Sequence, residues 1–267
     1  MTDTTTTHIP WNGSLQHEAV ELLRAGGNVV VSPTKVGYII LAVDADGLAR
    51  KFELKNRPLS KPSVVLCGSL DELVALAKVN DEIIDFYRAH WRQDVLMGCI
   101  LPWAPSGRAN IWPSVEPYVM DERCTSCFVI RFGAPAERIA SELWNRDRTV
   151  LFASSANPSG QGNKGLVAGI GERIDRGVDL VIEADEFVHG IQPSIDDRYE
   201  QGVMVSFVNE EGELVPEQRG RVVRGIRGEE ASDSYPTLIR AGLSLDRILV
   251  NMATHFPRWD YRHGQYY

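Results

Sequence analysis

The chain has 267 residues and a formal net charge of −8 at pH 7; 43% of its residues are hydrophobic and 24% are charged. This composition is typical of a soluble globular protein, and no segment approaches the roughly 18 consecutive apolar residues that a membrane span requires. The acidic balance argues against broad, non-specific binding to nucleic acid, although it allows a local basic pocket. The length predicts one main domain with an appendage.

The N-terminal residues 1–13 have neither a basic region nor an apolar stretch, so we expect a flexible tail rather than a secretory signal. Four irregularly spaced cysteines are too few for a disulfide scaffold and favour reduced thiols in the cytoplasm. Two of them, Cys124 and Cys127, form a CxxC pair. Without a second pair or a histidine cluster, the favoured interpretation is that Cys127 begins a buried strand, and we predict no metal site built by the protein.

Helical and strand patterns alternate along most of the chain. Apolar residues at helical spacing predict a helix over residues 14–25, which ends at Gly26 and Gly27, and a buried strand follows at 28–32. After a second strand at 63–67, Ser69 and Glu72 form a capping box that opens a helix to about residue 78. The next expected elements are a helix at 81–91, a strand at 127–132, a helix at 136–144, a strand at 149–153, a helix at 167–175 and a strand at 180–183.

This alternation predicts an α/β fold in which helices flank a sheet. Strands expected at 203–208 and 222–226 lie on either side of a turn at 209–212 and add antiparallel pairing, so the sheet should be mixed. Residues 101–121 include four prolines and little periodicity, which predicts a long ordered loop or lid. Residues 228–267 are expected to form a C-terminal extension with a polar linker, a helix and an aromatic tail.

Two polar segments lie near the ends of predicted elements. Ser32 to Tyr38 (SPTKVGY) follows a strand, where α/β sheets often open onto a ligand, but a purely structural turn is equally compatible with it. Lys55 and Arg57 precede a proline, so on an extended segment they would point the same way and could clamp a polyphosphate. A KxR pair by itself is more often a solvated basic surface.

A third polar segment, SSANPSG, follows the apolar strand TVLFA and contains Ser155, Asn157 and Ser159. Its small residues would let a ligand approach the backbone closely, and its hydroxyls and amide can bond to phosphate or ribose. The alternative is a simple turn with a helix cap.

Taken together, the three segments resemble the three successive motifs of the YrdC/Sua5 family. Further matches are Ile130-Arg131, which is similar to the family's "vRvP" strand, Pro193-Ser194-Ile195, similar to "PSTV", and Val223-Arg224-Gly225, similar to the closing "iRpG". The likeness covers about residues 15–227. It implies a domain over residues 14–227 with a twisted open sheet of parallel and antiparallel strands and a concave basic cavity.

The resemblance also implies an activity. The best-known family members are nucleotidyltransferases that condense L-threonine, bicarbonate and ATP into threonylcarbamoyl-AMP and pyrophosphate, which links them indirectly to tRNA through the modification threonylcarbamoyladenosine. Related domains make carbamoyl-AMP from carbamoyl phosphate. ATP, with magnesium, is therefore the implied cofactor.

By resemblance, each motif receives a role in this reaction. Charge accumulates on the phosphoryl group as a carbamate oxygen attacks the α-phosphorus, so Lys55 and Arg57 are the expected catalytic cations. The substrate side is assigned to Thr34, Tyr38 and Arg131. The expected ATP-binding residues are Lys55, Arg57, Lys61, Ser155, Asn157, Ser159, Ser194 and Arg224.

The chain departs from the family pattern mainly on the substrate side. Lys35 stands where the family has an acid, and Ile39 stands where it has glycine. The family's W-P-G-P-[LV]-T becomes residues 91–96 (WRQDVL), and the histidine that follows the "RvP" arginine is absent. Two alternatives therefore stay open: carbamoyl or acyl adenylation with another amine or with carbamoyl phosphate, and a non-catalytic module that binds nucleotide or RNA. The oligomeric state is not predicted.

Overall fold

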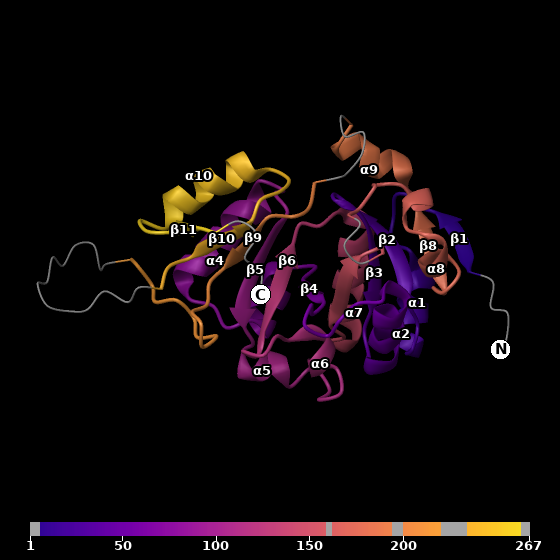
Figure 1. Cartoon of the computed structure of the whole chain (residues 1–267), viewed down its shortest axis with the longest axis horizontal. Coiled ribbons are helices and arrows are strands. Elements are labelled where there is room, and N and C mark those ends of the chain that lie inside the picture. The colour runs from indigo at the N-terminus through magenta and orange to yellow at the C-terminus, as the bar shows by residue number, and fades with distance from the viewer. Residues whose placement is uncertain (1–5, 159–161, 194–199, 220–233, 263–267) are drawn as a thin grey trace, which may run out of the picture.

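The computed structural model describes residues 6–158, 162–193, 200–219 and 234–262. Eleven strands form one sheet in the order β1-β8-β2-β3-β7-β4-β6-β5-β9-β10-β11, which runs across the whole molecule (Figure 1). Its strands are β1 (Thr7–Pro10), β2 (Val30–Thr34), β3 (Gly37–Ala42), β4 (Val64–Leu66), β5 (Met97–Pro102), β6 (Thr125–Ile130), β7 (Leu151–Ser155), β8 (Leu180–Glu183), β9 (Met204–Ser206), β10 (Thr237–Arg240) and β11 (Asp260–Tyr261).

The sheet is mixed, as the sequence predicts. β8 pairs in parallel with β1 and β2, β4 with β6, β5 with β9, and β10 with β11. The other neighbouring pairs are antiparallel, among them the β2–β3 hairpin and the central β3–β7 and β7–β4 pairs. This α/β architecture is an open sheet flanked by helices.

Helices cover both faces of the sheet. They are α1 (His17–Ala25), α2 (Ala45–Lys55), α3 (Leu70–Leu76), α4 (Asp81–Arg92), α5 (Pro105–Arg108), α6 (Glu116–Val119), α7 (Ala134–Asp147), α8 (Glu172–Asp175), α9 (Asp185–Ile191) and α10 (Leu245–His255), with a 3₁₀ turn at Val167–Gly169. Because strand side chains alternate between faces, Val65 packs with α3, α4 and α10, whereas Leu66 packs with α1 and α7. Near β1 and β8, a third cluster buries residues of α8 and α9.

The C-terminal extension is part of this architecture. Its β10 and β11 continue the sheet beyond β9, and α10 packs against α4 (Figure 1). Phe256 at the end of α10 is 2% exposed, and its ring centroid lies 5.2 Å from that of Phe86 and 5.2 Å from that of Phe207. The Phe86–Phe256 pair is edge-to-face, and such aromatic pairs stabilise a core by about 0.5–1.5 kcal/mol beyond area burial.

Several local expectations differ from the structure. Residues 7–10, expected in the flexible tail, form β1 because they pair with β8. The expected helix at 167–175 is divided where Gly171 takes a φ of 89°, which favours glycine. The expected loop at 101–121 contains β5's end and the short helices α5 and α6. The expected strand at 222–226 lies outside the described residues, and β9 pairs instead with β10.

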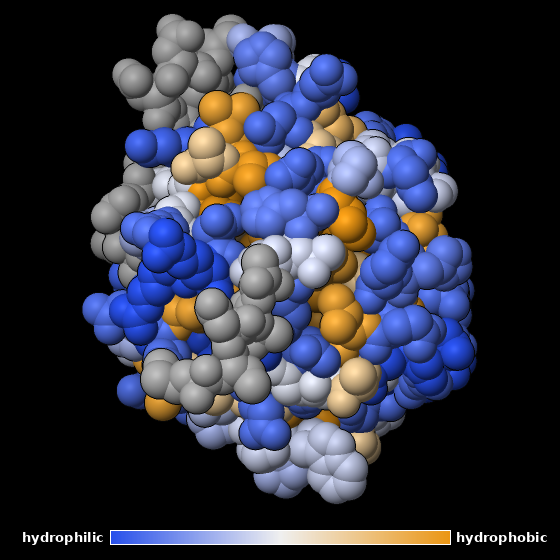
Figure 2. Space-filling model, turned by 90° about the vertical axis from the view of Figure 1, so that its right-hand side faces the viewer, coloured by the Kyte–Doolittle hydropathy of each residue, from blue (hydrophilic) through white to orange (hydrophobic). Residues whose placement is uncertain are grey.

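The hydropathy of the surface and the free thiols of Cys124 and Cys127 are typical of a globular protein. The face that carries α1, α8 and β1 is mainly hydrophilic with separate apolar patches (Figure 2). In the described parts of the chain, no helix has the length and apolar character needed to cross a membrane. Cys127 is buried in β6 and Cys124 is exposed, and both thiols are free.

Candidate active site

Lys55 lies at the end of a helix, and the expectation of an extended segment is wrong. Asp44 caps the start of α2 by accepting a hydrogen bond from the Gly47 amide (2.8 Å), and Asn56, with a left-handed φ of 48°, ends the helix. Lys55 is 2% exposed, and its Nζ donates to the backbone carbonyl of Ser155 and to the Ser155 hydroxyl (3.2 Å). The second and third motifs therefore meet at the end of β7.

The charge state of Lys55 is unusual for a lysine. Burial and, to a smaller extent, the positive charge of Arg57 together lower its pKa from 10.5 to about 7. Anionic groups close to Nζ would favour the protonated form and reverse part of this shift. Lys55 is therefore an amine that becomes fully charged when an anion lies beside it.

The other basic residues of this region hold the loop between α2 and β4. Arg57 Nε donates to the Lys61 carbonyl (2.6 Å) and Nη2 donates to the Pro62 carbonyl (3.0 Å), while the Lys61 side chain is exposed. Lys51, one turn before Lys55, is fully buried, and its Nζ donates to Ser63 Oγ (2.5 Å). Burial lowers the pKa of Lys51 far below its usual range. Lys51 belongs to the basic cluster that the sequence shows between residues 51 and 61, but no role was predicted for it, although its i,i+4 spacing from Lys55 places both on one helix face.

Two buried polar atoms at the end of β7 have no hydrogen-bond partner in the described part of the chain. These are Ser154 Oγ and Asn157 Oδ1, in residues that are 7% and 4% exposed, and the Asn157 amide nitrogen donates only to the Pro158 carbonyl (2.8 Å). An unpaired buried polar atom costs about 1–3 kcal/mol, so such atoms usually find a partner. Such atoms can bond to a ligand that reaches the end of β7. Ser159, Ser194 and Arg224, predicted for the same site, lie outside the described residues.

On the substrate side, Thr34 and Tyr38 already have partners within the protein. Thr34 Oγ donates to the Gly37 carbonyl (2.6 Å) and so closes the β2–β3 turn. Tyr38 is 0% exposed; its hydroxyl donates to Asp185 Oδ1 (2.6 Å) and accepts from the Ala184 amide (2.9 Å). Burial, with the Asp185 contact, raises the Tyr38 pKa well above its usual value. Both hydroxyls hold the fold together at these positions.

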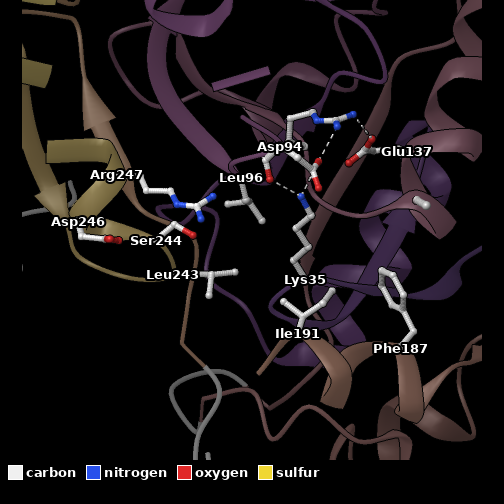
Figure 3. A pocket seen from close by; sticks show the side chains of 12 residues that line it. Lys35, Asp94, Leu96, Glu137, Phe187, Ile191, Leu243, Ser244, Asp246 and Arg247 are labelled. Carbon is white, nitrogen blue, oxygen red and sulfur yellow. Dashed lines mark hydrogen bonds and ion pairs between the residues drawn. The ribbon is translucent and has the colours of Figure 1, made fainter. Parts of the chain in front are cut away.

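Arg131 belongs to an ion network that the sequence did not predict. Its guanidinium pairs with Asp94 (2.6 Å) and Glu137 (3.3 Å) and stacks at 4.8 Å over the ring of Trp91. Asp94 also accepts from Lys35 Nζ (2.8 Å), as the dashed lines in Figure 3 show. Lys35 and Asp94 are two of the departures from the family pattern. The structure joins them in one ion pair at the tip of the β2–β3 hairpin.

A cavity of about 770 Å³ opens beside this network, between the hairpin tip, α9 and the start of α10 (Figure 3). Lys35 and Arg131 line one side, and Leu243 and Arg247 of the C-terminal extension line the other. Its lining includes three acidic as well as three cationic residues. A smaller cavity of about 160 Å³ lies beside Lys55, between the end of α2 and residues 170–174.

The larger cavity and the Ser155 side chain lie on the same face of the sheet. Leu96 at the cavity belongs to one core cluster with Ala153, on the face covered by α7. Because side chains alternate along β7, Ser155 lies on that face too. A metal site made of three or more His, Cys, Asp or Glu side chains is not found among the residues that the structure describes.

Comparison with known proteins decides the family. The Sua5/YciO/YrdC family model, described as "Telomere recombination", matches residues 21–205. The chain belongs to this family. A curated relative, threonylcarbamoyl-AMP synthase from Pyrococcus abyssi (strain GE5 / Orsay), is 24% identical over 174 residues, which are 64% of this chain and 47% of the relative. The chain therefore spans about half the length of that relative.

Solved structures agree with the family assignment. A hypothetical protein of Streptococcus mutans UA159, smu.1377c, is 46% identical with a TM-score of 0.88, and the match covers 98% of this chain and 100% of that one. P. abyssi Sua5 in complex with L-threonine is 17% identical with a TM-score of 0.60, over 93% of this chain and 61% of that one. The first match includes the C-terminal extension, and the second shows a common fold.

Proposed function

We propose that this protein is a nucleotidyltransferase that uses ATP to form a carbamoyl adenylate, with L-threonylcarbamoyl-AMP as the leading product. The observation that carries the proposal is the contact of Lys55 with Ser155 at the end of β7, a segment in which two buried atoms, Ser154 Oγ and Asn157 Oδ1, have no described hydrogen-bond partner. Membership of the Sua5/YciO/YrdC family supports it. In this role the protein would act in the cytoplasm and serve tRNA modification indirectly.

In the proposed reaction, the amine of L-threonine and bicarbonate first condense to a carbamate and water. A carbamate oxygen attacks the α-phosphorus of ATP, the new P–O bond forms, and the bond from the α-phosphorus to pyrophosphate breaks. Lys55, charged beside the triphosphate, stabilises negative charge on the phosphoryl group, and Ser155 and Asn157 orient the nucleotide. Magnesium, bound through the phosphate oxygens of ATP, would neutralise further charge.

A second activity of the same class has its own support. Thr34, Tyr38 and Arg131, expected to hold the substrate, are each bonded within the protein, and Lys35 pairs with Asp94 where the family pattern differs. This arrangement favours either another amine in place of L-threonine or carbamoyl phosphate as the source of the carbamoyl group. Adenylation would still take place beside Lys55.

The product of turnover tests both versions. The pure protein is incubated with MgATP and bicarbonate plus single amino acids, or with MgATP and carbamoyl phosphate, and adenylates and pyrophosphate are measured by mass spectrometry. We expect an adenylate with L-threonine or with one other substrate, and none from the Lys55→Met variant. ATP binding with no pyrophosphate from any substrate would instead indicate a non-catalytic nucleotide-binding module.

A further inference from the structure

Lys51, in α2, is a fully buried lysine that the proposed reaction does not use. Its Nζ donates to the hydroxyl of Ser63 (2.5 Å), the residue directly before β4. A buried polar group is costly even when it is hydrogen-bonded, and an alkyl side chain of similar size would fill the same space without that cost. Packing alone therefore does not account for a lysine at this position.

The contact between Lys51 and Ser63 lies at the end of the loop that holds Arg57. The Arg57 guanidinium donates to the carbonyls of Lys61 (2.6 Å) and Pro62 (3.0 Å), so its position depends on where this loop lies. Ser63 fixes the far end of the loop, because its amide donates to a carbonyl of α6 (2.8 Å) and its hydroxyl accepts from Lys51. A movement of Ser63 would therefore move Pro62 and, with it, one partner of Arg57.

Lys51 and Arg57 are also neighbours in space, on either side of one aromatic ring. Lys51 Nζ lies 5.7 Å from the centroid of the Phe52 ring, and the guanidinium carbon of Arg57 lies 5.9 Å from it. Burial lowers the pKa of Lys51 far below its usual range, and the charges of Arg57 and Lys55 lower it in the same direction. The uncharged amine, which these surroundings favour, can bond to Ser63 without adding a fixed positive charge beside Arg57.

We propose that Lys51 is a positioning residue: through Ser63 it holds the loop after α2 and so places the Arg57 guanidinium for the phosphates of the nucleotide. The inference rests on the proposed function, because Arg57 is one of the cations expected beside the triphosphate of ATP. Since Lys51 is fully buried, it acts through Arg57 and does not touch the nucleotide itself.

Hydrogen exchange of the full chain without ligand tests the contact itself. The variants are Lys51→Met, which fills the same space without an amine, and Ser63→Ala, which removes the hydroxyl. Each should speed exchange of the Lys61 and Ser63 amides, both hydrogen-bonded in this loop, by about fivefold, because one hydrogen bond of typical strength is lost. Lys78→Met, at an exposed position outside the loop, should leave both amides unchanged. Circular dichroism verifies that each variant is folded.

Calorimetric titration with MgATP tests whether the contact acts through Arg57. Lys51→Met and Ser63→Ala should each bind MgATP about fivefold more weakly than wild type. In an Arg57→Gln background, Lys51→Met should change the affinity by less than about twofold, because the guanidinium that Lys51 positions is already absent. A role confined to packing would instead change stability and leave MgATP affinity intact.

The inference is overturned if Lys51→Met leaves the exchange of both amides unchanged, if it leaves MgATP affinity unchanged, or if it weakens binding equally with and without Arg57. These outcomes are separate from those of the proposed function. Adenylate formation without coupling between Lys51 and Arg57 contradicts only this inference. Coupling between them without any adenylate contradicts only the proposed function, and a wild type that binds no MgATP contradicts both.

Discussion

The two halves of the candidate site differ in what their polar atoms already contact. Around Lys55, buried atoms of Ser154 and Asn157 have no partner within the described residues, and the lysine itself is held in a costly, partly neutral state. Around the β2–β3 hairpin, the hydroxyls of Thr34 and Tyr38 donate hydrogen bonds to the Gly37 carbonyl and to the Asp185 carboxylate. We propose that the first half binds a ligand, whereas the hydroxyls of the second half stabilise the fold.

This contrast shows that the hydrogen-bond partners of a motif's side chains can distinguish a structural role from a ligand-binding role. Buried polar groups almost always have a hydrogen-bond partner. A group that is paired within the protein stabilises the fold, whereas an unpaired group is available to bond to a ligand. The same family motif can therefore be functional at one end and structural at the other. Each variant below is expected to affect either activity or stability, according to its half.

The largest effect is expected for Lys55→Met. Removing the buried cation should reduce adenylate formation by about 100-fold or more, because a preorganised charge beside the phosphoryl group is lost. Lys78→Met, at an exposed position outside the site, should retain full activity. The measurement is pyrophosphate release at saturating ATP. If Lys55→Met lowers the rate of pyrophosphate release by less than fivefold, Lys55 does not take part in the reaction.

The same Lys55→Met variant should be more stable than wild type. A pKa lowered from 10.5 to about 7 corresponds to a cost of up to about 5 kcal/mol, and the lost bonds to Ser155 reduce the gain to about 2 kcal/mol. The native state binds fewer protons than the unfolded state between pH 7 and 10.5. The gain should therefore be largest at pH 7 and below and shrink towards pH 10.5. Urea unfolding across this range measures it, and a destabilised variant at pH 7 would contradict the account.

Tyr38→Phe should destabilise the protein and leave ATP binding intact. It removes the partner of the Ala184 amide and one donor to the Asp185 carboxylate at a half-buried position, so the free energy of unfolding should fall by about 1–2 kcal/mol. ATP affinity should stay within twofold of wild type. Chemical denaturation and calorimetry provide the two readouts. Normal stability combined with lost turnover would instead show that Tyr38 takes part in the reaction.

The smallest effect concerns the Lys35–Asp94 pair. Because the Asp94 side chain is 58% exposed, the coupling energy from a double-mutant cycle of Lys35→Ala and Asp94→Ala should be below about 1 kcal/mol and should fall in 1 M salt. A coupling above 2 kcal/mol would show that the hairpin tip depends on this pair more than its exposure indicates.

The sequence predicted local elements better than the contacts between them. The Ser69 cap formed as expected, with Ser69 Oγ accepting from the Glu72 amide at 3.0 Å, because both residues lie in one turn; Glu72 Oε2 accepts from the Gly68 amide (2.7 Å) instead of the Ser69 amide that a capping box uses. The hydrogen bond of Tyr38 could not be predicted because its partner Asp185 lies 147 residues away. Lys55 was expected on an extended segment, although Asn56 at the end of α2 is a residue type that often takes the left-handed conformation at a helix C-terminus. β1 was missed because its stability comes from pairing with β8.

Titration of wild type and two variants with MgATP tests the central claim most directly. We predict one saturable site in wild type, affinity at least tenfold weaker in Asn157→Ala, and unchanged affinity in Tyr38→Phe. The Asn157 carbonyl oxygen is buried without a described partner, so its loss should leave stability nearly unchanged while binding falls. No ATP binding by wild type, or equal affinity in wild type and Asn157→Ala, would contradict the account.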